Sequence, residues 1–449
     1  MVVANPRPVA SSLVAPSPAV PRTAARPAAR WIGLAGACFV LWALPADGLA
    51  QWTHFRGDGS ASVSGEVGLP ESFDVETGAN VAWRADLPGR GPASPIVVGR
   101  RVIVTASSGA RQDRLHVLCF DSADGRRLWH RQLWATGHTV CHPFGAVAAP
   151  TPASDGRLVF AFYSSNDLAC FDLDGNLRWL RGLALEHPAA RNDVGMASSP
   201  LVVGSTVIVQ CENAGDSFAE GIDTATGRTR WHLDRPAGAV WSSPTLLPGG
   251  PGEEDLVLLV SRSELSAHRP DTGAKVWSYE ASCHTIASPT VADSVVYLQA
   301  NGLSALRGRP GRSVAELLWH EPKLRSDNPS PVVHDGRVYV VKPPGILVCG
   351  DAHSGEVLWQ LRLEGPFWAT PVLADGRLYC VSHPGLVQIV RIGDRPERIA
   401  ACRIDEGILA SPAVAEGAVY FRSDARLWKI QSSTRRAAGP GANATGTSP

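Results

Sequence analysis

A unit of about 40 to 45 residues recurs along the sequence, and this repetition constrains the fold more than any other feature. In residues 220–277 one copy ends in an acidic turn that closes at Gly227, and Trp231 stands four residues after that glycine. The next copy places Gly273 and Trp277 at the same spacing. A unit of this length at a fixed period predicts an architecture in which each copy packs on its neighbours.

Each copy begins with a serine or threonine followed by proline. Proline lacks a backbone N–H, so the start of a strand is where it disturbs a sheet least. Short β-branched runs follow, often separated by an Asp-Gly pair such as Asp335-Gly336, which is a strong signal for a short hairpin. The motif occurs eight times, at Ser94-Pro95, Thr151-Pro152, Ser199-Pro200, Ser243-Pro244, Ser288-Pro289, Ser330-Pro331, Thr370-Pro371 and Ser411-Pro412.

The last strand of most copies carries a tryptophan after the acidic turn. The glycine of the turn can adopt a positive φ at little cost, as a bulged hairpin requires. A tryptophan at a repeated position of this kind is expected to pack between repeats, because its large apolar surface favours burial. We predict this structural docking role for Trp83, Trp129, Trp179, Trp231, Trp277, Trp319 and Trp359.

The two ends of the repeat region are complementary. Residues 79–87 form a strand with a tryptophan but no repeat of its own, whereas residues 411–430 form a repeat that lacks its last strand. Pairing the two segments would close a ring and remove its open edges. The sequence therefore predicts an all-β fold, an eight-bladed β-propeller of four-stranded antiparallel blades over residues 79–430, closed by an N-terminal strand. Residues near 398–403 should supply the outer strand of the seventh blade, there without a tryptophan.

The pattern Asp-x-x-x-Gly-x-x-x-Trp resembles the tryptophan-docking motif of the pyrroloquinoline-quinone (PQQ) type propellers. That superfamily includes quinoprotein alcohol dehydrogenases and the propeller lipoprotein of the bacterial outer-membrane assembly (BAM) complex. Trp52, the Phe55-Arg56-Gly57 segment and the Trp241-Ser242-Ser243-Pro244 segment resemble more closely the secreted PQQ-like repeat proteins of planctomycete-type bacteria. The resemblance covers residues 51–430. It implies the fold more strongly than an activity, because one fold hosts many functions.

The N-terminal segment, residues 1–50, has the parts of a secretory signal peptide. A basic region precedes an apolar run from Trp31 to Pro45, and small residues follow before Gln51. The run is short for a membrane span, and an uncleaved N-terminal anchor over residues 31–46 is the alternative. We therefore expect an exported protein of the periplasm or cell envelope that contacts a membrane only if this segment is retained.

Two further segments flank the propeller. Residues 51–78 are rich in glycine and serine without periodicity, and we expect an extended strap anchored by Trp52 and Phe55. Trp52 should contribute less to stability than the docking residue Trp277. Residues 431–449 are small and polar, which predicts a disordered tail.

The composition argues against several classes of function. The chain has 42 basic and 42 acidic residues and a formal net charge of zero, which argues against nucleic acid as the partner. Nine cysteines include no Cys-x-x-Cys and no adjacent pair. Two Cys-His pairs, Cys141-His142 and Cys283-His284, offer soft metal ligands, but equivalent loops of a ring are spread around it. We predict a monomer with no metal site.

Any pocket should lie on one face of the propeller. The connections between blades share that face with the loops that join second and third strands, so their side chains surround the mouth of the central channel. We predict no catalytic residues there. The candidate binding face consists of Arg90, His142, Asn192, Trp241, His284, Asn328, Trp368 and Glu406.

The leading interpretation is a non-catalytic scaffold that binds a protein or peptide partner in the cell envelope, for example in outer-membrane assembly. A PQQ-dependent oxidoreductase is the alternative, and the resemblance implies that such an enzyme would cap the quinone with an adjacent Cys-Cys disulfide and bind Ca²⁺ through acidic ligands. This chain lacks that pair, so we predict no cofactor, neither PQQ nor calcium. A glycan-binding surface protein is a third interpretation. The candidate groups for a quinone site lie on scattered loops: Trp241, Trp368, Arg90, Arg262, Lys342, Arg422, Asp405 and Glu406.

Overall fold

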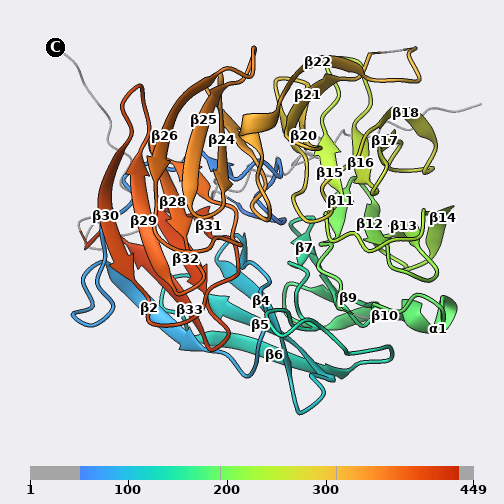
Figure 1. Ribbon diagram of the computed structural model, residues 1–449. Helices are drawn as coiled ribbons and strands as arrows, with labels where there is room; N and C mark the ends of the chain where they lie inside the picture. The colour runs from blue at the N-terminus through green and yellow to red at the C-terminus, as the bar shows by residue number, and fades with distance from the viewer. Residues whose placement is uncertain (1–50, 193, 310, 434–449) are drawn as a thin grey trace, which may run out of the picture. The chain divides into compact units, whose positions relative to one another are not determined.

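The computed structural model describes residues 51–192, 194–309 and 311–433, and these form eight β-sheets arranged as the blades of a propeller (Figure 1). The predicted signal peptide or anchor, residues 1–50, lies outside the described residues, as does most of the predicted tail. No helix within the described residues has the length and apolar character needed to cross a membrane.

Blades one to four follow the chain in order, with the first strand of each nearest the central channel. Blade one consists of β3 (Ile96–Val98), β4 (Arg101–Ser108), β5 (Arg114–Asp121) and β6 (Arg127–Trp134). Blade two consists of β7 (Ala153–Ser154), β8 (Leu158–Phe162), β9 (Asp167–Asp172) and β10 (Leu177–Gly182). Blade three consists of β11 (Leu201–Val203), β12 (Thr206–Cys211), β13 (Phe218–Asp223) and β14 (Thr229–Asp234). Blade four consists of β15 (Thr245–Leu247), β16 (Leu256–Val260), β17 (Glu264–His268) and β18 (Lys275–Glu280).

The remaining blades repeat this plan, with additions from the N-terminal region in the last two. Blade five consists of β19 (Thr290–Ala292), β20 (Val295–Gln299), β21 (Leu303–Arg307) and β22 (Glu316–Glu321). Blade six consists of β23 (Val332–His334), β24 (Arg337–Lys342), β25 (Ile346–Asp351) and β26 (Val357–Arg362). Blade seven consists of β27 (Val372–Ala374), β28 (Arg377–Val381), β29 (Leu386–Arg391), β30 (Glu397–Arg403) and the added β1 (Val63–Ser64). Blade eight consists of β31 (Ala413–Ala415), β32 (Ala418–Arg422), β33 (Arg426–Gln431) and β2 (Val81–Asp86).

The ring closes through blade eight. Its outer strand β2 comes from the N-terminal side of blade one and pairs antiparallel with β33, with Val81 opposite Ile430 and Asp86 opposite Arg426. This confirms the predicted all-β, eight-bladed fold of four-stranded antiparallel blades and its closure by an N-terminal strand. The outer strand of blade seven is β30, which carries no tryptophan, as the sequence predicts.

The docking tryptophans lie at the junctions between blades. Trp179 packs on the turn glycine of blade three, Gly227, whose φ is 71°. A Cβ at Gly227 would lie 2.7 Å from the Trp179 ring, so the turn needs glycine both for its backbone conformation and for this close approach. Six of the seven indole Nε1–H groups donate to a turn carbonyl of the next blade: Trp83 to Ser122, Trp129 to Leu173, Trp179 to Thr224, Trp231 to Pro270, Trp319 to Ala352 and Trp359 to Gly393.

The strap differs from expectation in how deeply it is inserted. Trp52 is 2% exposed, the same as Trp277, and it belongs to the largest apolar cluster, which also contains residues of blades one, seven and eight. Since the two side chains are equally buried, we now expect Trp52 to contribute about as much to stability as Trp277. A sequence without periodicity does not indicate which of its side chains are buried. The strap contains β1, which pairs parallel with the inner strand β27 of blade seven.

Candidate functional site

Residues 52–64 of the strap cross the central channel and form hydrogen bonds with the innermost strands of several blades. Trp52 exchanges two backbone hydrogen bonds of 2.9 Å with Val97 of blade one. Further bonds join the strap to other inner strands: Ser154 N to Thr53 O in blade two, Val202 N to His54 Nε2 in blade three, Arg56 Nη1 to Thr290 Oγ1 in blade five, and Leu373 N to Ser62 O in blade seven. One end of the channel is thus filled by the chain itself.

Two ionisable strap residues are buried in this filled end. Burial lowers the pKa of His54 to about 4 and that of the Arg56 guanidinium to about 9. His54 is therefore neutral at pH 7. The Arg56 guanidinium donates to Thr290 Oγ1 and to the carbonyl of Pro289, and burial is the only cause that acts on its pKa. Among the described residues, Arg56 is thus held by neutral hydrogen-bond acceptors and by no ion pair.

Above the strap, the repeated Ser/Thr-Pro motifs form a girdle of hydrogen bonds around the channel. In seven of the eight motifs, the backbone N–H of the serine or threonine donates to the side-chain hydroxyl of the corresponding residue in the next blade. These bonds measure 2.9–3.0 Å and run from Ser94 through Thr151, Ser199, Ser243, Ser288, Ser330 and Thr370 to Ser411. The motif that marks the start of each inner strand therefore also links neighbouring blades.

The girdle is interrupted at the closing seam, the junction of blades eight and one. There the Ser94 hydroxyl has no hydrogen-bond partner. Arg422, at the end of β32, reaches across the seam and donates from Nη1 to the carbonyls of Gly91 and Ala93. Its side chain is 1% exposed, burial lowers its pKa to about 10, and its Nε and Nη2 have no partner. A buried guanidinium with two unused donors favours an anionic group beside it.

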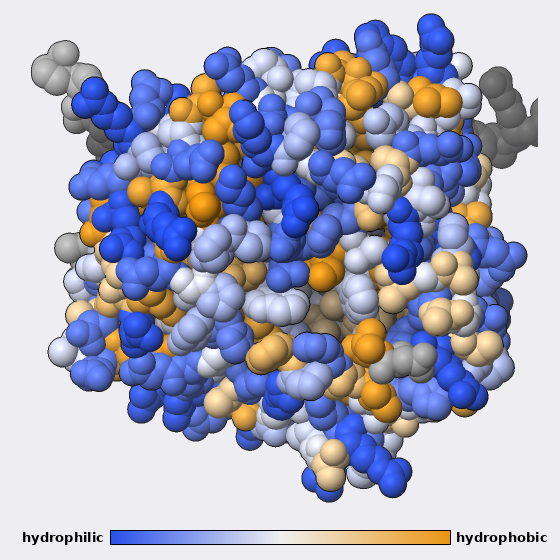
Figure 2. All heavy atoms as spheres, in the orientation of Figure 1, coloured by the Kyte–Doolittle hydropathy of each residue, from blue (hydrophilic) through white to orange (hydrophobic). Residues whose placement is uncertain are grey.

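A cavity of about 440 Å³ lies at the mouth of the channel, over the girdle. Phe55 of the strap lines it, and so do seven of the eight girdle residues. Its other walls are mostly apolar, and Figure 2 shows hydrophobic side chains around a hollow near the centre of this face. The large apolar residues that line the cavity are Pro92, Phe144, Val194, Met196, Trp241, Ile286, Trp368 and Leu409.

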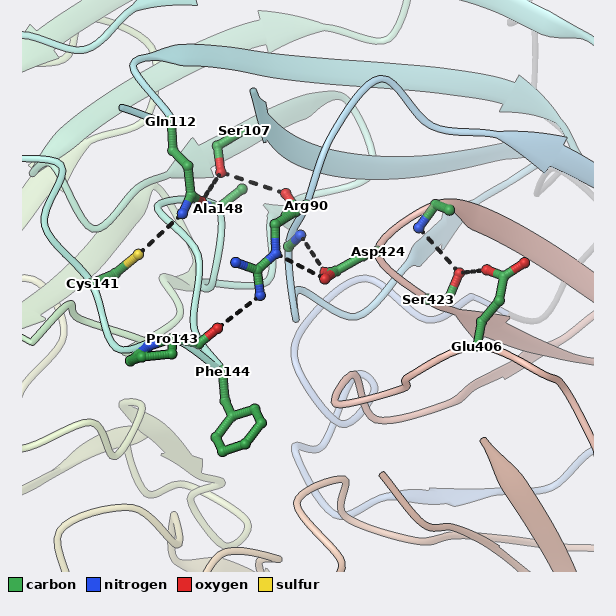
Figure 3. Close-up of polar contacts among 12 residues, drawn as sticks. Arg90, Ser107, Gln112, Cys141, Pro143, Phe144, Ala148, Glu406, Ser423 and Asp424 are labelled. Atoms are coloured by element: carbon green, nitrogen blue, oxygen red, sulfur yellow. Dashed lines mark hydrogen bonds and ion pairs between the residues drawn. The ribbon is translucent and has the colours of Figure 1, made fainter. Parts of the chain in front are cut away.

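The loop between blades one and two partly covers this cavity. Arg90 forms an ion pair with Asp424, with a 2.9 Å separation between Nε and Oδ2, and donates from Nη2 to the carbonyl of Pro143 (Figure 3). These contacts hold the backbone beside Phe144, whose ring extends from the loop and is 49% exposed. The Phe144 ring lies 6.3 Å from that of Trp368, so the two aromatic groups stand together at the rim.

The structure brings together half of the predicted binding face. His142, Trp241, Asn328 and Trp368 line the cavity. Trp241 is fixed in place because its Nε1–H donates to the carbonyl of Gly195 at 2.7 Å. The four residues come from connections that follow different blades, which is the arrangement that the propeller geometry implies.

The other four residues of the predicted face do not line the cavity. Asn192 is buried and donates to Ser164 O and Asn166 Oδ1 within the protein. His284 is half-buried, and burial lowers its pKa. Glu406 is held by Ser423 and Arg426.

Arg90 borders a smaller hollow of about 50 Å³ beside the cavity, which Arg422 also lines. The two hollows share Pro92, Phe144 and Leu409. The small hollow therefore extends the cavity towards the closing seam and towards the unused donors of Arg422.

Phe55 and Phe144 are absent from the predicted face. Phe55 was missed because only the threading of the strap brings it to the channel. Phe144 could have been found from the sequence. It lies in the segment His142-Pro143-Phe144-Gly145, in a connection between blades, and an exposed aromatic side chain at such a position indicates a binding role.

Comparison with known proteins identifies the family. The family model described as outer membrane protein assembly factor BamB matches residues 39–238, 189–280 and 217–438. The chain belongs to this family. Among curated proteins, none matches significantly.

Solved structures show that members and relatives of the BamB family share the fold with enzymes. BamB from Moraxella catarrhalis is 18% identical, with a TM-score of 0.57 over 79% of this chain and 97% of that chain. Quinohemoprotein alcohol dehydrogenase from Comamonas testosteroni is 13% identical, with a TM-score of 0.66 over 85% and 81%. A europium-containing methanol dehydrogenase is 14% identical, with a TM-score of 0.62 over 84% and 90%. At these identities the likeness establishes the propeller fold, and function must be argued from the site.

The residues around the cavity do not fit PQQ with calcium. Ca²⁺ takes about six to eight oxygen ligands, carboxylates among them. No Asp or Glu occurs among the described residues that line the cavity, and Asp424 in the adjoining hollow is paired with Arg90. Of the predicted quinone cations, Arg422 and Arg90 border the small hollow, whereas Arg262 and Lys342 border neither space.

Proposed function

We propose that this BamB-family protein is an exported, non-catalytic scaffold whose channel mouth holds an apolar segment of a protein partner in the cell envelope. The observation that carries the proposal is the 440 Å³ cavity, whose walls are apolar and aromatic and whose rim exposes Phe144 and Trp368. Exposed aromatic groups beside a concave apolar surface are typical of protein-recognition sites.

The polar groups of the cavity support a binding role more than a catalytic one. The girdle hydroxyls accept hydrogen bonds from backbone N–H groups, so they are part of the fold. Burial raises the pKa of the Cys141 thiol, which keeps it in its weakly nucleophilic protonated form. The proposal therefore includes no quinone, no metal and no covalent chemistry at the mouth.

Arg422 adds a preference for charge. Arg422 lines the small hollow that continues the cavity, and its Nε and Nη2 have no hydrogen-bond partner. A carboxylate there would gain charge-assisted hydrogen bonds and would offset the cost of a buried guanidinium. The favoured partner segment is thus one in which an apolar or aromatic side chain is followed closely by a carboxylate.

Fluorescence anisotropy with labelled peptides tests this proposal. One peptide carries an aromatic residue next to Glu, and its matched partner carries Gln instead of Glu. We expect saturable binding of the Glu peptide, about tenfold tighter than that of the Gln peptide. Trp368→Ala should weaken binding by at least about tenfold, as for an aromatic anchor at an interface.

Trp134→Ala is the matched control, because Trp134 is 60% exposed and lies on the outer strand β6, away from the cavity. It should leave peptide affinity unchanged. Equal losses in the two tryptophan variants, or no binding of either peptide, would overturn the proposal. One-to-one binding of PQQ with Ca²⁺ that Trp241→Ala abolishes would overturn the absence of a quinone site and would favour the oxidoreductase alternative.

A further inference from the structure

A second cluster of polar side chains lies outside the cavity, on blade three and on the connection that leads to it from blade two. Glu220 of β13 and His232 of β14 are directly opposite each other in the sheet. His187 follows the short helix α1 (Leu183–Glu186) in the connection from blade two. His187 Nε2 lies 3.0 Å and His232 Nδ1 lies 3.2 Å from the same oxygen, Glu220 Oε1. Two imidazole nitrogens and one carboxylate oxygen thus converge on one point.

We propose that His187, Glu220 and His232 form a binding site for a divalent first-row transition-metal ion, with zinc as the probe. Two imidazoles and one carboxylate are a donor set that suits such ions, and a water would complete four-coordination. Ligand bonds of about 2.0–2.2 Å in a tetrahedron separate neighbouring ligand atoms by roughly 3.3 Å. The three ligand atoms already lie within 4.8 Å of one another, so an ion would require small side-chain shifts.

The surrounding residues orient the ligands as a metal site requires. Glu220 Oε2 accepts from the Thr229 hydroxyl at 3.1 Å and lies 3.6 Å from Arg181, which leaves Oε1 to face the two imidazoles. Arg181 itself is paired with Glu186, which offsets its charge near the site. Fixed outer partners of this kind preserve the orientation of metal ligands.

The two imidazole rings are also aligned. They stack on each other with centroids 5.1 Å apart and planes 14° from parallel. The Phe218 ring packs on His187 at 4.2 Å. This stacking limits rotation of both rings and keeps His187 Nε2 and His232 Nδ1 directed at Glu220.

His232 has a carboxylate oxygen near each of its two ring nitrogens. The second nitrogen of His232, Nε2, lies 3.3 Å from Asp234 Oδ1, so this imidazole stands between two carboxylates. A neutral imidazole has one N–H and can donate to only one of them. With a metal on Nδ1, the Nε2–H donates to Asp234, and both carboxylates face positive charge. The Glu220 carboxylate is 4% exposed, whereas the His232 side chain is 36% exposed, which leaves a route for the ion.

Calorimetry at pH 7.5 on full-length protein stripped with a chelator tests the site. We expect zinc to bind with micromolar or tighter affinity at a one-to-one ratio, and Mg²⁺ not to compete, because it prefers oxygen ligands. Co²⁺ in place of zinc should give a visible absorption band that zinc displaces. His232→Ala and the volume-matched Glu220→Gln should each weaken zinc binding by at least about tenfold.

His130→Ala is the matched control. His130 and His116 form another close histidine pair, with Nδ1 of His116 and Nε2 of His130 2.9 Å apart, and the described contacts give neither ring a carboxylate partner. Zinc binding should be unchanged in this variant. Loss of binding in His130→Ala, retained binding in His232→Ala, or no zinc binding to the wild-type protein would each overturn the proposal. Unchanged far-UV circular dichroism of the His232→Ala variant shows that any loss reflects the ligand and not the fold.

Discussion

The two ends of the central channel are built from the same eight inner strands, but the strands find their hydrogen-bond partners in different ways at each end. At the strap end, residues 52–64 supply backbone and side-chain hydrogen-bond partners to the inner strands, and Trp52 is buried there. At the mouth, the inner strands are joined to one another by the girdle of Ser and Thr hydroxyls, and the cavity above it is apolar. The chain thus fills one end with its own residues and leaves the other end available for a partner.

This difference explains how a propeller can close and still offer a binding surface. The innermost strands are two or three residues long in the blades described, so each leaves little free edge to protect. At one end, the strap forms hydrogen bonds with those edges. At the mouth, Arg422 keeps two donors without a partner, and the side chains of Phe144 and Trp368 are exposed to solvent.

Deleting Val81–Asp86, the closing strand β2, should have the largest effect on both ends. The deletion exposes the edge of β33 and removes the Trp83 contact between blades eight and one. We expect loss of cooperative unfolding and insoluble expression, because an unpaired edge beside an exposed blade surface favours aggregation.

A deletion of equal length provides the control. The β15–β16 loop of blade four spans residues 248–255, and removing residues 249–254 leaves the two-residue connection found in other blades. This variant should remain soluble and unfold cooperatively by thermal denaturation. Similar behaviour of the two deletions would mean that closure by β2 does not hold the ring.

Trp52→Ala tests the strap end next. Trp52 is as buried as Trp277, and a Cβ at Gly57 would lie 2.9 Å from its ring, which shows how closely the strap folds around it. Removing a buried indole should cost about 3–5 kcal/mol of unfolding free energy, similar to Trp277→Ala. Urea unfolding of the two variants measures this directly. A much smaller loss for Trp52→Ala would mean that the strap is dispensable to the core.

The fold was predictable because its signals are local and repeated. Eight Ser/Thr-Pro motifs, the turn glycines and the tryptophans after them indicate the blade number and the closure without knowledge of any contact between distant residues. A strand such as β30 could be placed without its tryptophan because the copies on either side set the spacing.

The candidate site was only half predictable because it depends on contacts between distant segments. His142 and Trp368 follow from their positions in connecting loops. The strap residue Phe55 reaches the cavity through pairing that no sequence pattern encodes. Likewise, the cluster of His187 with Glu220 combines a connecting loop with a sheet position, and neither residue belongs to a motif with regular spacing.

Acidification should destabilise the strap end through His54. Its pKa is about 4 in the folded protein and 6.5 in the unfolded chain, so between these values the unfolded state binds a proton that the folded state excludes. Stability is therefore retained above pH 6.5 and falls as the pH drops towards 4, by about 3 kcal/mol at most.

Urea midpoints of wild type and His54→Gln between pH 7 and pH 4 isolate this contribution. His116, whose pKa is also lowered to about 4, is present in both proteins and cancels in the difference. The variant should be less stable at pH 7, because a bond to Val202 N is altered, and should lose less stability on acidification. If the urea midpoints of the two proteins fell equally between pH 7 and pH 4, His54 would not contribute to the pH dependence of stability.

Of these changes, Phe144→Ala at the mouth should have the smallest effect on stability, in contrast to Trp52→Ala at the strap end. The Phe144 ring is 49% exposed, and its aromatic contacts are with His142, with the rim residue Trp368 and, at 5.2 Å, with His383. Because most of this surface already faces solvent, the unfolding free energy should fall by less than about 1 kcal/mol. Peptide affinity should nevertheless decrease measurably, since the ring forms part of the cavity wall. Urea unfolding and anisotropy on the same preparation separate the two quantities. A stability loss comparable to that of Trp52→Ala would place Phe144 in the core and remove the distinction between a closed end and an open mouth.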